Sequence, residues 1–236
     1  MGKIFGHRGL PNIYRENSIT SLNKAFEYCD YVETDVRITA DNNLILFHDP
    51  DINGQFINQL STEEILSQLI DVENCLKYIS TASNPVFILG NGAHDVNKDD
   101  MINIIESFNC PLINEMSARG IVPDSHHLSY GLSDQRANPV ARAIEESDLI
   151  ILLGKELDFT LDYGNPPAIS KNTKLIQVDP DEYTLGKFKR SDLSILCSVG
   201  IFIKELSKLI NENSDLRKNP DIFSTFNNNK EAHLRY

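Results

Sequence analysis

Short apolar runs, each followed at once by ionisable residues, recur three times in the first 50 positions. The runs at residues 3–6, 31–32 and 44–47 have the length and composition of β-strands. After the second run, the spacing of two between Glu33 and Asp35 places both carboxylates on one face of an extended chain. Because α/β folds carry their chemistry at the carboxyl ends of strands, we expect a site built from these strand ends.

Helical patterns follow the strands. After the first strand, Asn17 or Ser18 can cap a helix whose apolar residues recur at spacings of three and four through residues 22–26. The sequence Ser-Thr-Glu-Glu at residues 61–64, followed by regularly spaced apolar residues, predicts the capped start of a second helix. Residues 72–79 form a third amphipathic segment. Strands and helices therefore alternate in this part of the chain.

The second part of the chain alternates more regularly. Apolar strands are predicted at residues 86–89, 149–153, 175–178 and 194–196, and helices at residues 99–108 and 140–146. Such alternation predicts a parallel, doubly wound sheet with helices on both faces. The expected fold class is α/β: a β/α segment over residues 1–83, for which only a family resemblance implies a partial TIM-barrel-like arrangement, a Rossmann-like doubly wound parallel-sheet domain over residues 84–213, and a polar, disordered tail over residues 214–236.

Composition and charge narrow the function classes. A formal net charge of −12 over 236 residues argues against nucleic-acid binding, since phosphate backbones are bound by clustered Lys and Arg. No apolar run approaches the roughly 18 residues of a membrane span, and no signal peptide is visible. The four cysteines lie far apart with no C-x-x-C pair, so we expect a cytoplasmic protein without a disulfide or zinc framework.

The residues at the ends of the first three strands are suited to phosphate-ester chemistry. They are two histidines, two carboxylates and one arginine: His7, Arg8, Glu33, Asp35 and His48. Hard carboxylate oxygens suit a divalent cation that neutralises a phosphate, and near-neutral imidazoles can take and give protons. The residues alone predict a metal-assisted phosphoryl site.

The pieces GHRGLP, RENS, VETDVR and FHDPDI, in this order and spacing, resemble the start of a glycerophosphodiester phosphodiesterase, a metal-dependent TIM-barrel family. The resemblance implies that His7 and His48 are the general base and acid and that Arg8 holds the phosphate. It implies that Glu33 and Asp35 bind Mg²⁺ or Ca²⁺ and that the substrate is a glycerophosphodiester.

The resemblance ends within the strand predicted at residues 86–89. The family carries a further metal-binding Glu there and a Lys two residues on, but this chain has Leu89 and Asn91. Glu73 or a partner subunit could supply the missing ligand. About the first third of the family's pattern is covered.

From residue 84 the chain resembles the central domain of thiamine-diphosphate enzymes such as acetolactate synthase and pyruvate oxidase. The matching pieces are NPVFILGNGAH, CPLINEMSARGIVPDSHHLSYG, IEESDLIILLGKELD and KLIQVDPDEYTLGK, over about residues 84–210. The resemblance implies a homo-oligomer or a partner chain. The G-D-G motif that would hold the diphosphate is absent, so thiamine diphosphate is not expected from this chain alone.

Four residues of this region have a structural and a cofactor-binding interpretation. Gly90, Gly92 and Gly154 close strands, where a glycine serves either a tight turn or the approach of a phosphate, and Asp179 either caps a turn or meets a ribose hydroxyl. The cofactor in the second interpretation is FAD or ADP, as in some related enzymes.

The pair His126-His127 invites a metal interpretation. Adjacent side chains on an extended chain point apart, however, so we expect no metal there. Three functions then compete: a metal-dependent phosphodiester hydrolase fused to a thiamine-enzyme central domain, a nucleotide-binding or structural subunit without hydrolase activity, and an inactive relic.

Overall fold

The structure, a computed structural model, describes residues 2–52, 54–136 and 138–213. The chain divides into two compact units, Met1–Leu69 and Ile70–Tyr236. The tail expected at residues 214–236 lies outside the described residues. Among the described residues no helix is both long and apolar enough to cross a membrane.

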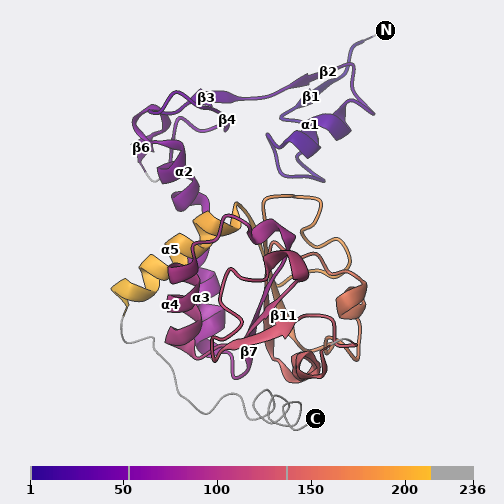
Figure 1. Cartoon of the computed structure of the whole chain (residues 1–236). Coiled ribbons are helices and arrows are strands. Elements are labelled where there is room, and N and C mark those ends of the chain that lie inside the picture. The colour runs from indigo at the N-terminus through magenta and orange to yellow at the C-terminus, as the bar shows by residue number, and fades with distance from the viewer. Residues whose placement is uncertain (1, 53, 137, 214–236) are drawn as a thin grey trace. The chain divides into compact units, whose positions relative to one another are not determined.

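The first unit begins with a small β-α-β arrangement. Strand β1 (Phe5–His7) pairs in parallel with β2 (Tyr31–Glu33), and helix α1 (Ile19–Ala25) connects them (Figure 1). Ser18 caps α1 by accepting a hydrogen bond from the backbone of Ser21. The two strands expected to carry site residues are therefore neighbours, and their register sets His7 opposite Glu33.

The third expected strand forms as β4 (Leu44–Leu46), but it pairs antiparallel with β3 (Val36–Ile38) and not with the β1–β2 pair. The turn between β3 and β4 is the reason, because a parallel connection needs a dozen or more residues and a hairpin needs only a few. The rest of the unit consists of β5 (Asp51–Ile52), β6 (Gln55–Phe56), the 3₁₀ helix η1 (Ile57–Gln59) and α2 (Thr62–Leu69).

A capping box starts α2, as the sequence predicts. The backbone N–H of Ser61 donates to Glu64 at 2.7 Å, and the backbone N–H of Glu64 donates to the Ser61 hydroxyl at 3.3 Å. A small core lies beneath the helix and is made of Ile52, Ile57, Leu60 and Ile65, with Ile45 and Phe47 packed against it.

The second unit contains a six-stranded parallel sheet in the order β12-β11-β10-β7-β8-β9. Its strands are β7 (Pro85–Leu89), β8 (Leu112–Asn114), β9 (Ser129–Leu132), β10 (Leu149–Leu153), β11 (Lys174–Asp179) and β12 (Leu193–Leu196). This is the strand order of a doubly wound Rossmann-like sheet, which confirms the expected fold class. The chain reverses its direction of winding between β7 and β10, where such sheets place their ligands.

Helices cover both faces of the sheet. On one face lie α3 (Val72–Thr81), α4 (Lys98–Phe108) and α5 (Val199–Glu212), and Figure 1 shows these three helices side by side. On the other face lie η4 (Pro139–Glu146) and η5 (Phe159–Gly164). The segment predicted as a helix at residues 140–146 is thus a 3₁₀ helix. Two further short 3₁₀ helices are η2 (Asn91–Ala93) and η3 (Met116–Ala118).

The two units separate after Leu69, whereas the sequence placed the junction at residue 83. The difference is helix α3, whose buried residues Cys75, Leu76 and Ile79 belong to the core of the second unit. The hydrophobic faces of α3 and α5 pack into the same core. Helix α3 therefore folds with the sheet that follows it in the chain.

Candidate functional site

The turn after β1 has a backbone that few residues adopt. Arg8 has φ 56° and Gly9 has φ 88°, both in the left-handed region. A Cβ on Gly9 would lie 2.3 Å from the hydroxyl of Ser21, so only glycine fits against α1 here. The Ser21 hydroxyl accepts from the backbone N–H of Leu10 at 2.7 Å. The turn is therefore held against α1, and it presents His7 and Arg8 at the strand end.

Four of the five predicted site residues come together at this strand end. The Nε2 of His7 lies 3.8 Å from Oε2 of Glu33, and the backbone N–H of Arg8 donates to the same oxygen at 3.2 Å. The Arg8 guanidinium lies 3.2 Å from Asp35 and 3.1 Å from Glu16. One arginine is thus surrounded by three carboxylates, while the His7 imidazole remains 71% exposed.

Asn17 fixes the position of Asp35. The sequence predicted Asn17 only as a possible helix cap and did not identify this role. Its amide N–H donates to Oδ2 of Asp35 at 3.1 Å, and its side-chain oxygen accepts from the backbone N–H of Asp35 and from the Thr34 hydroxyl. Asn17 has φ 54°, a conformation that asparagine tolerates better than most residues. The Asn in the RENS motif is the signal that could have identified it.

Among the described residues, the contacts of the other four site residues do not include His48, whose neighbour Phe47 bonds to Asp35 through the backbone. The backbone N–H of Phe47 donates to the Asp35 carbonyl at 3.1 Å, and Arg37 donates to the His48 carbonyl. The Nδ1 of His48 lies 2.7 Å from Oδ1 of Asp49. Asp49 therefore orients the ring through Nδ1.

The ligand types at this strand end suit a hard divalent cation with an anion beside it. Among the described residues, Oδ1 of Asp35 and Oε1 of Glu33 take part in no hydrogen bond, and the buried Nε of Arg8 lies 3.2 Å from Oδ2 of Asp35 without a hydrogen bond. Carboxylate oxygens are ligands that Mg²⁺ and Ca²⁺ accept, and a guanidinium suits a phosphate oxygen.

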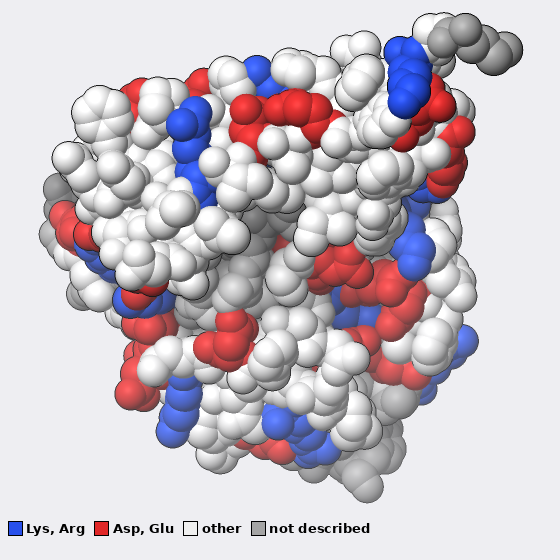
Figure 2. Space-filling model, turned by 90° about the horizontal axis from the view of Figure 1, so that it is seen from above, with Lys and Arg blue, Asp and Glu red and all other residues white. Residues whose placement is uncertain are grey.

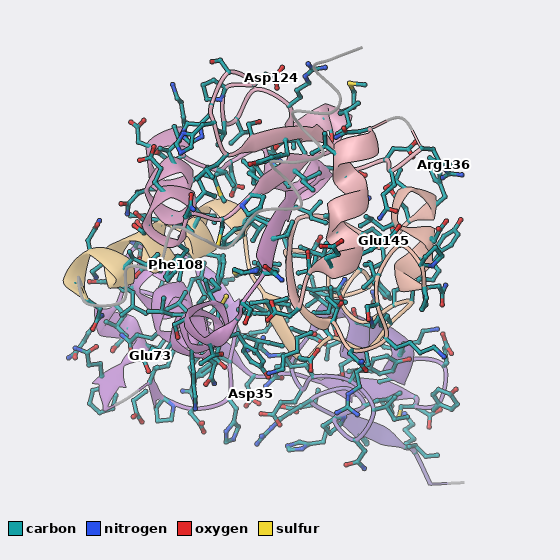
Figure 3. The ribbon with its side chains drawn as sticks, turned by 90° about the horizontal axis from the view of Figure 1, so that it is seen from below. Asp35, Glu73, Phe108, Asp124, Arg136 and Glu145 are labelled. Carbon is teal, nitrogen blue, oxygen red and sulfur yellow. The ribbon has the colours of Figure 1, made fainter. Side chains whose placement is uncertain are left out.

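Leu89 stands at the position where the resemblance to the phosphodiesterases places a further metal ligand. Leu89 is fully buried in β7, in the core of the second unit. Glu73, on α3, also belongs to that unit, and Asp35 belongs to the first (Figure 3).

At the carboxyl ends of β7 and β10, the three glycines of the second unit touch one another. A Cβ on Gly90 would lie 2.4 Å from the Gly154 carbonyl, and a Cβ on Gly154 would lie 2.4 Å from the backbone of Gly92. The N–H groups of Gly90, Gly92 and Gly154 donate to the carbonyls of Leu153, Gly154 and Val178. The close backbone approach explains all three glycines, and their N–H groups are used within the protein.

A buried ion cluster lies beside these glycines. The Lys155 side chain is 0% exposed, and its ammonium lies 2.6 Å from both Glu115 and Asp158. Burial alone would raise the pKa of Asp158, but hydrogen bonds from Lys155 and Thr160 outweigh it and hold the pKa below its ordinary value. The sequence gives no signal for this cluster, because its members follow two strands that are not adjacent in the chain.

Asp179 ends β11 and is 7% exposed. Desolvation is the main cause that raises the pKa of its carboxyl group, and the charges of Asp181 and Glu156 act in the same direction. Its Oδ1 accepts from the backbone N–H of Asp181 at 2.8 Å, as expected for a residue that caps a turn.

The expectation that His126 and His127 point apart is wrong. Their rings stack with centroids 4.6 Å apart. The segment is a turn and not an extended strand, since the backbone N–H of His126 donates to the Pro123 carbonyl and that of Ser129 donates to the His126 carbonyl. In a turn, successive side chains can lie on one side of the chain.

The charge distribution agrees with the overall acidity. On the face shown in Figure 2, the basic side chains of the described residues are scattered among acidic ones and form no continuous patch.

The parallel Rossmann-like sheet and its helical layers define an α/β domain of the kind found in thiamine-diphosphate enzymes. The chain belongs to the family described as thiamine pyrophosphate enzyme, central domain, whose model matches residues 72–206. A second model, for the glycerophosphoryl diester phosphodiesterase family, matches residues 7–110. Both matches include residues 72–110, which form α3, β7 and α4 of the second unit.

Several proteins of known class are similar to the chain. The acetolactate synthase large subunit of Lactococcus lactis is 28% identical over 188 residues, which cover 78% of this chain and 31% of the relative. Human 2-hydroxyacyl-CoA lyase 1 is 29% identical over 129 residues, which cover 54% of this chain and 21% of the relative. The chain spans about a fifth to a third of the length of these relatives.

Among solved structures, a thiamine diphosphate-dependent 4-hydroxybenzoylformate decarboxylase from Rhodococcus jostii RHA1 shares the fold. The TM-score is 0.50 at 20% identity, and the match covers 59% of this chain and 27% of that chain.

Proposed function

We propose that the first unit is a phosphodiester hydrolase site of the glycerophosphodiester class, which acts with a divalent cation. The observation that carries the proposal is the convergence of His7, Arg8, Glu33 and Asp35 at the ends of β1 and β2. One proton-transfer group, an anion-binding group and hard-oxygen ligands thus stand at one pair of strand ends, each within 3.8 Å of another member of the set. The match of the glycerophosphoryl diester phosphodiesterase model over residues 7–110 supports this assignment.

Each residue has a role that follows from its contacts. Glu33 and Asp35 would hold Mg²⁺ or Ca²⁺ through the oxygens left unused, with water and phosphate oxygens at the remaining positions. The cation, when bound, neutralises charge on the phosphate. Arg8, whose guanidinium pairs with Asp35 and Glu16, would bind a phosphate oxygen, and Asn17 keeps Asp35 in place.

Proton transfer falls to the two histidines. The exposed His7 ring takes a proton from the attacking hydroxyl or water, and His48, oriented by Asp49, gives a proton to the leaving oxygen. Two carboxylates hold a hard cation less firmly than three, so the site should require millimolar rather than trace metal.

The test is hydrolysis of a bis-aryl phosphate and of glycerophosphodiesters by the full chain with Mg²⁺, Ca²⁺ or EDTA. His7→Gln and His48→Gln should each lower the rate by about 100-fold or more, since general acid–base groups contribute roughly 10² to 10⁴. His94→Gln, at an exposed histidine of the second unit, is the matched control and should have no effect. Turnover that survives EDTA, or that His7→Gln leaves unchanged, overturns the proposal.

We infer further that the second unit is a structural domain that packs in an assembly, as a subunit or in a homo-oligomer. This second candidate is favoured by the glycine contacts, because the backbone N–H groups that a FAD or ADP phosphate would use already donate to carbonyls. Calorimetric titration of the full chain with FAD and with ADP tests it. Absence of heat for both, with a multimeric mass in light scattering, is the expected result, and micromolar nucleotide binding would contradict it.

A further inference from the structure

Glu106, His126 and His127 bring three potential metal ligands together in the second unit. One ligand atom from each lies within 4.8 Å of the other two. Glu106 stands near the carboxyl end of α4, and the two histidines lie in the loop between η3 and β9. Two of the three residues are exposed, so an ion from solution can reach them.

The arrangement depends on the turn that stacks the two rings. Within this turn the backbone N–H of Leu128 donates to Nδ1 of His126 at 3.2 Å. That contact leaves the ring proton on Nε2, which lies 3.2 Å from Oε1 of Glu106. His127 stacks on the same ring. The contact between His126 and Glu106 thus joins the loop to α4, and the His127 imidazole lies beside this contact.

We propose that Glu106, His126 and His127 form a binding site for a borderline divalent metal such as Zn²⁺, with the remaining position open to water. This class of ion binds imidazole nitrogen together with a carboxylate, whereas Mg²⁺ prefers oxygen ligands alone. Two ligand atoms at the usual 2.0–2.1 Å from a tetrahedral Zn²⁺ lie roughly 3.3 Å apart. The observed 3.2 Å between His126 and Glu106 matches this spacing before any ion is bound.

Binding rearranges one proton. The ion takes the Nε2 lone pair of His126, the ring proton moves to Nδ1, and the long contact with the Leu128 N–H is lost. No proton is released in this step. The bound ion then has two bonds to the loop, through His126 and His127, and one to α4, through Glu106.

This site is independent of the proposed hydrolase site in the first unit. That site offers hard carboxylate oxygens, which suit Mg²⁺ or Ca²⁺, whereas this one offers two imidazoles. The two sites share no residue, so substitutions separate them.

The experiment titrates Zn²⁺ into the EDTA-treated and dialysed full chain by calorimetry and measures the thermal transition. His127→Gln and Glu106→Gln should each weaken one Zn²⁺ site by about tenfold or more and remove the Zn²⁺-induced rise in transition temperature. His94→Gln and Asp35→Asn are the controls and should leave that site intact. Because His127 and Glu106 are exposed, both variants should keep the wild-type circular dichroism spectrum.

Co²⁺ absorption identifies the ligands. A tetrahedral or five-coordinate d–d spectrum without a sulfur-to-cobalt charge-transfer band is expected, and it should disappear in His127→Gln. The proposal is overturned if the wild-type chain binds no Zn²⁺, if His127→Gln binds it as tightly as wild type, or if the spectrum shows thiolate ligation.

Discussion

The ammonium of Lys155 lies 2.6 Å from the carboxylate of Glu115. Lys155 follows β10 and Glu115 follows β8, and β7 lies between these two strands in the sheet. The ion pair therefore passes over the end of β7. A Cβ on Gly90, at the end of β7, would lie 2.6 Å from the Cα of Lys155. The ion pair and the close backbone approach therefore stand at the strand ends where many doubly wound sheets hold a ligand. This geometry leads to the first two predictions.

Lys155→Met should lower the free energy of unfolding by about 3 kcal/mol, because it leaves Glu115 and Asp158 facing each other without their shared cation. Urea denaturation followed by circular dichroism measures the change. Lys187→Met is the matched control, since Lys187 forms an exposed pair with Glu156 and should cost less than about 1 kcal/mol. Equal effects of the two substitutions would show that burial of the cluster does not matter.

Gly154→Ala should destabilise the second unit by about 3 kcal/mol or more. The substitution adds both the strain of φ 59° and a contact of 2.4 Å with the Gly92 backbone. Gly186→Ala isolates the strain, because Gly186 has φ 69° with nothing within 4 Å of an added Cβ, and about 1 kcal/mol is expected. Urea denaturation measures the loss of unfolding free energy in each variant. The difference between the two losses is the cost of the steric contact between Gly154 and Gly92.

Asp179→Asn should stabilise the protein at pH 7. The folded-state pKa of Asp179 is raised above its ordinary value by desolvation, so the folded state binds this proton more tightly than the unfolded state. The carboxylate consequently destabilises the fold above its folded-state pKa, and this penalty disappears as the pH falls below the unfolded value of about 3.8. Unfolding measured from pH 3 to pH 8 checks the sign, and a stabilisation that grows toward acid would contradict it.

Asn17→Gly should lower phosphodiester turnover by roughly 10- to 100-fold if the proposed hydrolase site is active, since small displacements of a ligand have effects of this size. Glycine keeps the left-handed backbone but removes the three hydrogen bonds that position Asp35 and Thr34. The concentration of Mg²⁺ for half-maximal activity should rise as well. Asn42→Gly, at an exposed turn residue with φ 60°, is the control and should behave as wild type.

The local elements could largely be predicted from the sequence. The α/β alternation of the second unit, the Ser18 cap and the Ser61–Glu64 capping box follow from periodicity and from side-chain chemistry within a few residues of one another. The neighbouring placement of His7 and Glu33 also followed from their positions at the ends of strands. Strands β8 and β9 were missed as strands because they are short, and β9 lies at an edge of the sheet.

Only the tertiary structure decided how the pieces combine. It assigned α3 to the second unit, paired β4 with β3, joined Lys155 to Glu115, and stacked His126 on His127. It also gave the glycines at the ends of β7 and β10 a packing role. The physical reason is that periodicity and caps act over a few residues, whereas burial and backbone approach depend on segments that are distant in the chain. The sequence by itself determined which chemical groups stand at the strand ends, and the packing of the sheet determined which of them meet.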